Sequence, residues 1–246
     1  MERFHNLGYV KGFRVFTDAE IATLQEEYEK LLLLLPPGKS ISRVNWWHKR
    51  NRFIYDLCLD PRLLDHVEDI LGPDFFLWGS HFFVKEPGDG TIVPWHQDAQ
   101  YWPLTPQHAV TVFIAFTDCD RDNACMRVIP GSHRARANHH ANPDARYILN
   151  QEIDADQFSP EDAVYLELKA CEISLHHDGL AHGSEANLSN RRRVGFTMRF
   201  SATDVKCDRS VWPNFQAFLA RGVDRYRHNP VGTPPTEYGA PTGMME

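Results

Sequence analysis

Two segments of this 246-residue chain hold the residues best suited to chemistry. The first contains His96 and Asp98, which are separated by one residue. In an extended chain, residues two positions apart point to the same side, so both side chains can reach one metal ion. The second segment places His176, His177 and His182 within seven residues. Each segment alone is weakly specific, because about one His-x-Asp pair is expected by chance in a chain with thirteen histidines.

An arginine farther along the chain makes a metal-binding role for these segments more specific. Arg193 lies eleven residues after His182, at the start of a β-rich run. Two histidines and one carboxylate form the facial triad of non-haem Fe(II) oxygenases, which leaves metal positions open. A guanidinium in the same barrel can pair bidentately with the far carboxylate of a metal-chelating 2-oxo acid. The pattern therefore predicts a metal site beside Arg193, with His176 or His177 as alternatives to His182, and Arg199 as the alternative arginine.

Four motifs extend this pattern. In chain order they are Trp95-His96-Gln97-Asp98-x-x-Tyr101-Trp102, Asn123-x-x-Met126-x-Val128-Ile129-Pro130-Gly131-Ser132-His133, Ser174-Leu175-His176-His177 and His182-Gly183-Ser184-x-x-Asn187-x-Ser189-x-x-Arg192-Arg193. Their order and spacing together are far more specific than any one of them. On these motifs, residues 77–205 resemble the phytanoyl-CoA dioxygenase family of Fe(II)/2-oxoglutarate-dependent oxygenases.

The resemblance implies a role for each matching residue. His96, Asp98 and His182 match the iron ligands of the family. Arg193 matches the arginine that holds the distal carboxylate of 2-oxoglutarate, and Ser184 stands where a helping hydroxyl is expected. The implied reaction consumes O2 and 2-oxoglutarate, releases succinate and CO2, and hydroxylates an unactivated C–H bond of a small molecule. The halogenating relatives replace the aspartate with a small residue, so the presence of Asp98 favours hydroxylation.

Three further residues are candidates for the same pocket. Thr111 faces inward if residues 109–116 alternate as a strand, which makes it a candidate contact for the cosubstrate. Tyr101 and Trp102 match the aromatic pair that the resemblance places near the substrate.

The chain also departs from the family pattern. Ala124 and Cys171 stand where family members tend to have glycine, and Ser184 is followed by Glu185 and Ala186 instead of the commoner Gly-Pro. These departures leave the metal ligands intact and bear on loop shape and substrate choice.

Two other functions are compatible with the same residues. A metal hydrolase or isomerase on a cupin-like barrel would hold Zn²⁺ with an open water and would have no use for Arg193. A small-molecule sensor would keep the barrel without turnover. Measurement of 2-oxoglutarate-dependent O2 uptake with added Fe(II) separates these two functions from the dioxygenase.

The elements that must position these residues are mainly β-strands. Six β-rich runs alternate with turn clusters, at residues 75–85, 109–116, 126–129, 163–168, 173–177 and 193–200. Many short strands predict a jelly-roll or barrel, and the resemblance implies a double-stranded β-helix core, like that of cupins. A capping box at residues 17–20 predicts a helix that ends at Pro36, and Asp60 followed by Pro61 predicts a second helix ending at Gly72.

The expected organisation is one oxygenase domain over residues 1–246. Within it we expect a mainly helical part at 1–74, the β-helix core at 75–206, and a C-terminal helix, at 212–226, and tail within 207–246.

The composition and charge of the chain argue against several classes of partner. Hydrophobic residues make up 42% of the chain and the net charge is −7, which argues against disorder and against a nucleic-acid partner. No apolar stretch reaches the length of a membrane span, and neither terminus shows a targeting pattern. The five cysteines include no C-x-x-C pair. We therefore expect a cytoplasmic monomer or homodimer that acts on a small molecule.

Overall fold

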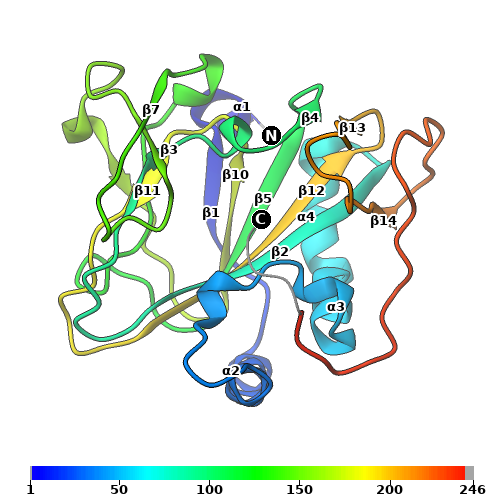
Figure 1. Cartoon of the computed structure of the whole chain (residues 1–246), viewed down its shortest axis with the longest axis horizontal. Coiled ribbons are helices and arrows are strands. Elements are labelled where there is room, and N and C mark those ends of the chain that lie inside the picture. The colour runs from blue at the N-terminus through cyan, green and yellow to red at the C-terminus, as the bar shows by residue number, and fades with distance from the viewer. Residues whose placement is uncertain (1, 242–246) are drawn as a thin grey trace.

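The larger of two antiparallel sheets is built from long runs of buried residues (Figure 1). The computed structural model describes residues 2–241. In order across the sheet, the strands are β1 (Tyr9–Arg14), β10 (Glu172–His177), β5 (Ala109–Ala115), β12 (Arg193–Ala202), β2 (Phe75–Lys85) and β14 (Phe218–Arg221). The central strands β5 and β12 are buried along almost their whole length, which matches their nearly continuous apolar sequence.

The smaller sheet faces the larger one across a pocket lined by residues from both. Its strands are short, and their order is β3 (Val93–His96), β11 (His182–Ser184), β6 (Arg127–Val128) and β9 (Val164–Tyr165). Two strand pairs lie outside the two sheets, β4 (Leu104–Thr105) with β13 (Lys206–Cys207), and β7 (His139–Ala141) with β8 (Gln151–Ile153). Two facing antiparallel sheets in this order form the expected double-stranded β-helix, or jelly-roll.

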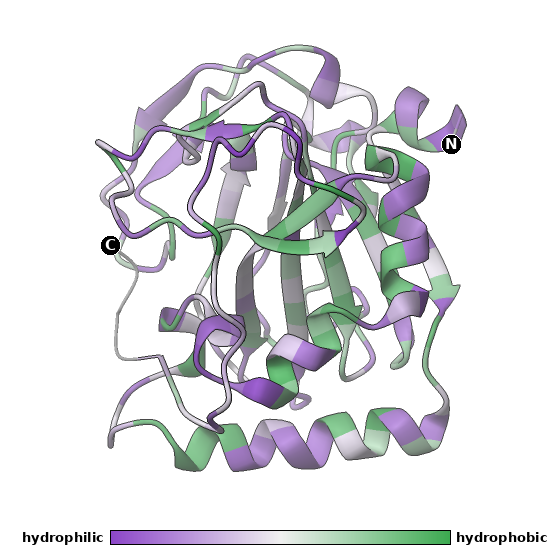
Figure 2. Ribbon diagram, turned by 90° about the vertical axis from the view of Figure 1, so that its right-hand side faces the viewer, coloured by the Kyte–Doolittle hydropathy of each residue, from purple (hydrophilic) through white to green (hydrophobic). Residues whose placement is uncertain are grey.

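Helices cover the outside of the larger sheet (Figure 2). They are α1 (Glu2–Leu7), α2 (Asp18–Leu33), α3 (Arg52–Cys58) and α4 (Pro61–Leu71). Both predicted helices are present. The Thr17 capping box begins α2, and Asp60 caps α4 with Pro61 at its first position. The main core lies between these helices and the sheet, where Tyr28 packs 5.5 Å from the Phe82 ring. No helix among residues 2–241 has the length and apolar character that crossing a bilayer requires.

Single-turn 3-10 helices connect several of these elements. They are η1 (Ile41–Arg43), η2 (Trp47–Lys49), η3 (Asp98–Gln100), η4 (Ser132–Arg134) and η5 (Pro160–Asp162). Of these, η3 begins at one of the predicted metal ligands.

The predicted C-terminal helix over residues 212–226 is wrong. This segment contains turns and the strand β14, which pairs with β2. Phe218 is buried beside Tyr55 of α3, and Phe215 packs against Trp78 of β2. Phe215 and Phe218 therefore belong to different parts of the core and do not share one helical face. The same sheet contains β1, which was not predicted because Gly12, with φ of 82°, introduces a bulge that breaks the alternating pattern.

Candidate metal centre

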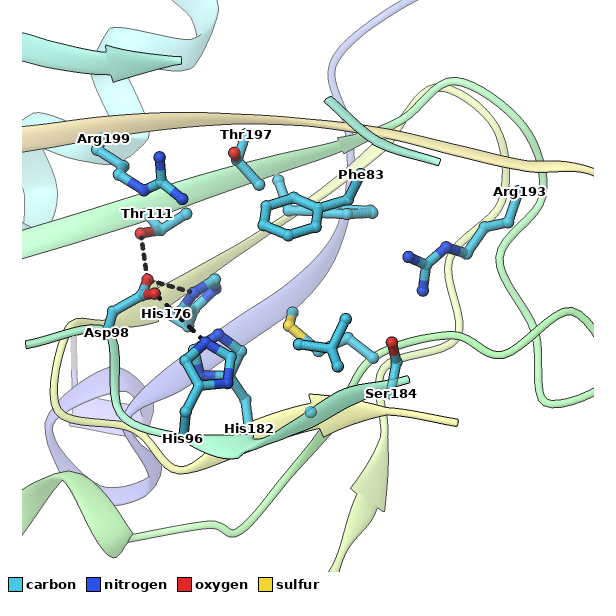
Figure 3. A pocket seen from close by; sticks show the side chains of 14 residues that line it. Phe83, His96, Asp98, Thr111, His176, His182, Ser184, Arg193, Thr197 and Arg199 are labelled. Atoms are coloured by element: carbon cyan, nitrogen blue, oxygen red, sulfur yellow. Dashed lines mark hydrogen bonds and ion pairs between the residues drawn. The ribbon is translucent and has the colours of Figure 1, made fainter. Parts of the chain in front are cut away.

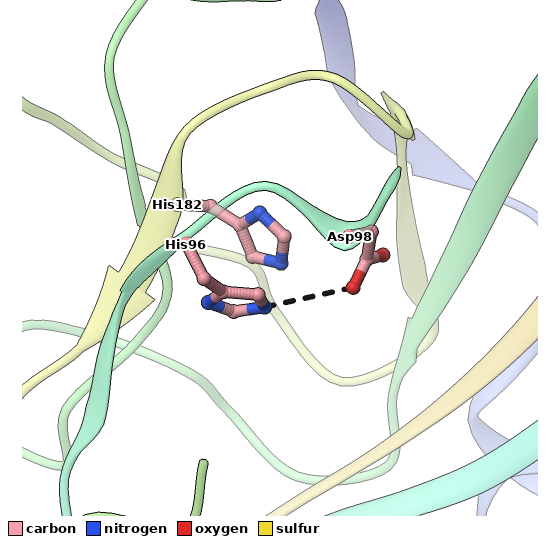
Figure 4. Close-up of side chains that lie close together, drawn as sticks. All are labelled: His96, Asp98 and His182. Carbon is pink, nitrogen blue, oxygen red and sulfur yellow. Dashed lines mark ion pairs between the residues drawn. The ribbon is translucent and has the colours of Figure 1, made fainter. Parts of the chain in front are cut away.

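Two histidines meet across neighbouring strands of the smaller sheet. His96 ends β3 and His182 begins β11, and the two are paired in the antiparallel register. Their ring centroids lie 4.1 Å apart (Figure 4). Gly183 allows this close approach of the strands, because a Cβ atom at that position would lie 2.8 Å from the carbonyl oxygen of Val93.

Backbone carbonyls orient both imidazole rings. Nδ1 of His96 lies 2.9 Å from the carbonyl oxygen of Pro94, and Nδ1 of His182 lies 2.9 Å from that of Leu180. A carbonyl only accepts hydrogen bonds, so both Nδ1 atoms donate and the proton of each neutral ring stays on Nδ1. The lone pair of each Nε2 is therefore free to bind a metal.

Asp98 completes the group from the first turn of η3. Its Oδ1 lies 3.5 Å from Nε2 of His96. Its Oδ2 accepts a hydrogen bond of 3.2 Å from the Thr111 hydroxyl and lies 3.6 Å from Nε2 of His176. The prediction assumed an extended chain through residue 98, whereas the backbone turns there. The turn still directs the carboxylate toward the histidines (Figure 4).

The donor set fits a divalent iron. Ligand atoms of His96, Asp98 and His182 all lie within 4.8 Å of one another, and this is the one such group among residues 2–241. Burial and the neighbouring His96 hold the pKa of His182 well below its usual range, which keeps the ring neutral. Burial opposes ionisation of Asp98, but the close contacts of its carboxylate with the rings of His176 and His96 outweigh burial and hold the pKa of Asp98 well below its usual range. Two neutral imidazoles and one carboxylate are the ligands of a facial triad.

A pocket extends from these three residues between the sheets. Figure 3 shows Arg193 at one end of the pocket and Arg199 at the other, with Asp98 on the side of Arg199 and the two histidines next to Asp98. The two arginines and Thr197 lie on the same face of β12, since residues at even spacing along a strand share a face. Sequence parity identified both arginines, and the same rule would have found Thr197.

Arg193 is buried with unused donors. Its side chain donates one hydrogen bond from Nη1 to the carbonyl of Ala124, while its Nε has no partner. Ser184 lines the same part of the pocket, and its buried hydroxyl also has no partner. Burial lowers the pKa of Arg193, but an arginine guanidinium stays charged at any ordinary pH. This end of the pocket therefore presents a fixed cation and a free hydroxyl.

Lys85 adds a titratable cation to the same end. It is the cross-strand partner of Arg193, and its Nζ donates to the carbonyl oxygens of Thr91, Ser184 and Glu185. Burial, followed by the charge of Arg193, lowers the pKa of Lys85 to about 7.

Gly195 lies on the same face of β12 as Arg193, where a residue without a side chain could leave room for a ligand. Instead, the space is filled by the ring of Phe113, because a Cβ atom on Gly195 would lie 2.1 Å from Cζ of that ring. Phe113 itself lines the pocket and was not predicted, because its contact with Gly195 depends on the pairing of β5 with β12.

The other predicted residues lie at defined places around the pocket. Thr111 faces inward as predicted, and its hydroxyl donates a hydrogen bond to Asp98. Its contact with a cosubstrate stays a prediction. Tyr101 and Trp102 line a wider outer pocket that shares several residues with the inner one. Of the alternative histidines, His176 faces inward beside Asp98, whereas His177 is partly exposed and interacts with Asp178.

A family model described as "Phytanoyl-CoA dioxygenase (PhyH)" matches residues 4–195, which is most of the chain. The chain belongs to the phytanoyl-CoA dioxygenase family. This membership confirms the resemblance drawn from the four motifs. Ala124 and Cys171, at which the sequence was expected to depart from the family pattern, have φ of 64° and 79°, the left-handed region that glycine favours. The backbone thus keeps the conformation of a glycine at both positions.

Individual members show the same relationship. "Phytanoyl-CoA dioxygenase, peroxisomal" of Mus musculus is 26% identical over 196 residues, covering 76% of this chain and 55% of that protein. The chain therefore spans about half the length of this relative. Among solved structures, "non-heme monooxygenase; ThoJ apo" has a TM-score of 0.82 at 27% identity, covering 96% of this chain and 88% of that chain. "CytC3 with Fe(II) and alpha-ketoglutarate" shares the fold with a TM-score of 0.71 at 23% identity, covering 97% and 94%.

Proposed function

We propose that this chain is an Fe(II)/2-oxoglutarate-dependent dioxygenase that hydroxylates an unactivated C–H bond of a small molecule, with release of succinate and CO2. The observation that carries the proposal is one pocket in which two imidazoles and a carboxylate converge near a buried arginine with unused donors. Membership of the phytanoyl-CoA dioxygenase family supports it.

The residues of the pocket divide between metal and cosubstrate. His96, Asp98 and His182 would hold Fe(II), and Arg193 with Ser184 would hold the distal carboxylate of 2-oxoglutarate. When bound together, iron, 2-oxoglutarate and O2 supply the oxidising power that the side chains of the protein lack, through decarboxylation of the 2-oxo acid.

The protein itself orients ligands and excludes water. The carbonyls that accept from the two Nδ1 atoms fix the direction of each Nε2 lone pair. Thr111 and His176 lie against Oδ2 of Asp98, so that Oδ1 is the oxygen directed toward His96. The ring of Phe113 closes the side of the pocket near Arg193, where low exposure strengthens a charged hydrogen bond. Tyr101 and Trp102 are proposed to contact the substrate in the outer pocket.

The test separates binding from turnover. Anaerobic titration of the Fe(II)-loaded protein with 2-oxoglutarate should give the visible absorption of a chelated iron complex, and admission of O2 should then produce succinate. His96→Ala and Asp98→Ala should abolish both signals, because each removes one of three ligands. His177→Ala is the matched control and should keep both signals, since this histidine lies outside the group of three. Wild-type succinate formation by His96→Ala would contradict the proposal, as would a protein that purifies with zinc and does not bind 2-oxoglutarate.

The finer expectations on partners and location are proposals as well. We propose a cytoplasmic monomer or homodimer, which is supported by five buried cysteines that carry no disulfide within the described part of the chain. Light scattering after size-exclusion chromatography tests the oligomeric state, and fractionation of the source cells tests the location.

A further inference from the structure

Arg199 is a pocket residue to which the proposed metal and cosubstrate chemistry gives no role. It lies on β12 six residues after Arg193 and faces the same pocket, at the opposite end (Figure 3). Its Nε is buried without a partner, and its side chain forms no hydrogen bond or ion pair with any residue between 2 and 241. Arg199 is only partly exposed, and a guanidinium with limited access to water and no protein partner gains from meeting an anion from outside the chain.

Packing holds Arg199 in place and leaves its donors free. Its stem lies across Gly79, its partner on β2, where a Cβ atom would lie 3.0 Å from Cδ of the arginine. Its guanidinium lies 5.4 Å from the centroid of the Trp102 ring. Neither contact uses an N–H group, so the planar donor set remains available for a carboxylate or phosphate.

The balance of charges in a pocket that holds metal and cosubstrate also favours an anion at Arg199. Asp98 is the nearby anion that acts on Arg199, but its charge is engaged once a metal binds. When Lys85 is neutral, the charges of a divalent iron, Asp98, dianionic 2-oxoglutarate and Arg193 cancel, and protonation of Lys85 adds a positive charge only at the Arg193 end. Arg199 is then a positive charge without a counterion at the end of the pocket that 2-oxoglutarate leaves open.

Aromatic side chains surround this end of the pocket. Trp102 packs edge-on against Trp78 at 4.6 Å, and Trp78 lies 5.9 Å from Trp212. All three tryptophans line the outer pocket that opens from Arg199. The aromatic wall next to Arg199 favours a planar or apolar ligand body on that side, although other parts of the outer pocket are polar.

We propose that Arg199 binds an oxyanion, a carboxylate or phosphate, on the primary substrate, whose planar or apolar body lies along the wall formed by Trp102 and Trp78. The description of this ligand as the substrate rests on the proposed dioxygenase function. The binding of an anion at Arg199 does not depend on turnover, and it is tested without turnover.

The experiment measures binding by calorimetry under anaerobic conditions, with the protein loaded with Fe(II) and 2-oxoglutarate and also without them. The probes are 3-phenylpropionate, its neutral amide 3-phenylpropionamide, and phenyl phosphate. The wild type should bind at least one of the two anions about tenfold or more tightly than the amide, since only the anions form charge-assisted hydrogen bonds with the guanidinium. Arg199→Gln should lose this preference and keep its affinity for 2-oxoglutarate.

Arg193→Gln is the reciprocal control, which should lose affinity for 2-oxoglutarate and keep the preference for the anionic probes. Equal binding of anions and amide by the wild type, absence of binding by both anions, or a preference that persists in Arg199→Gln would overturn the inference. A wild-type protein that binds the anionic probes through Arg199 but does not bind 2-oxoglutarate would refute the proposed function and leave the anion site standing. The choice between carboxylate and phosphate follows from the relative affinities of the two anions.

Discussion

Replacement of Arg193 by glutamine should weaken 2-oxoglutarate binding far more than it changes anything else. The side chain is 3% exposed, so water cannot take over its role. It donates one hydrogen bond to the Ala124 carbonyl, and its other N–H groups are available to bind a carboxylate. Removal of one partner from a buried charged pair costs about 2–5 kcal/mol. A loss of about 3 kcal/mol corresponds to a rise in Kd of roughly a hundredfold.

The assay is anaerobic titration of the Fe(II)-loaded variant with 2-oxoglutarate, followed by the absorption of the iron complex. Arg192→Gln is the matched control. Arg192 is the preceding residue, it is exposed, and it pairs with Glu29 and Glu86 on the surface, so its loss should leave the Kd unchanged. Metal affinity should be the same in both variants. An Arg193→Gln protein that binds 2-oxoglutarate as tightly as the wild type would refute the assignment of this arginine to the cosubstrate.

Three further outcomes are expected. Gly183→Ala should reduce Mn²⁺ affinity by about 10- to 100-fold in calorimetry, because a Cβ atom 2.8 Å from the Val93 carbonyl pushes β11 away from β3. An unchanged affinity would show that the spacing of these strands does not determine the geometry of the metal site. Affinity for 2-oxoglutarate should fall as pH rises through about 7, because burial lowers the pKa of Lys85 to about 7 and the neutral amine no longer attracts the dianion. Lys85→Met should show no such dependence on pH, and a wild type whose affinity does not change with pH would contradict the prediction. Mn²⁺ at about a hundred times its Kd should stabilise the wild type by about 2.7 kcal/mol in thermal unfolding but should not stabilise Asp98→Ala, and equal stabilisation of both would place the metal elsewhere.

The sequence carried strong signals for the long strands and for the three candidate ligands. Residues 75–85 form β2 with the predicted bounds, because eleven residues of apolar and aromatic character between turns have few alternatives. The histidine at 182 was preferred to those at 176 and 177 on motif spacing, and the structure brings it together with His96 and Asp98.

Other features depend on information that is not local. The orienting partners of His96 and His182 are backbone carbonyls, which every residue carries, so residue types give no signal for them. The spacing of Phe215, Phe218 and Leu219 suits a helical face, and only the pairing of β14 with β2 shows why this segment is extended. The sequence provides the pattern, whereas the register between distant strands decides which apolar side chains meet.

The strands β1 and β14 form the two borders of the larger sheet, and both come from outside residues 75–206. A fragment trimmed to that range would expose the backbone N–H and C=O groups of β10 on one side and of β2 on the other. Bare strand borders recruit other chains, so such a fragment should self-associate although it retains every candidate iron ligand. The terminal strands therefore protect both edges of the larger sheet, and any shortened version for crystallography or engineering has to retain both.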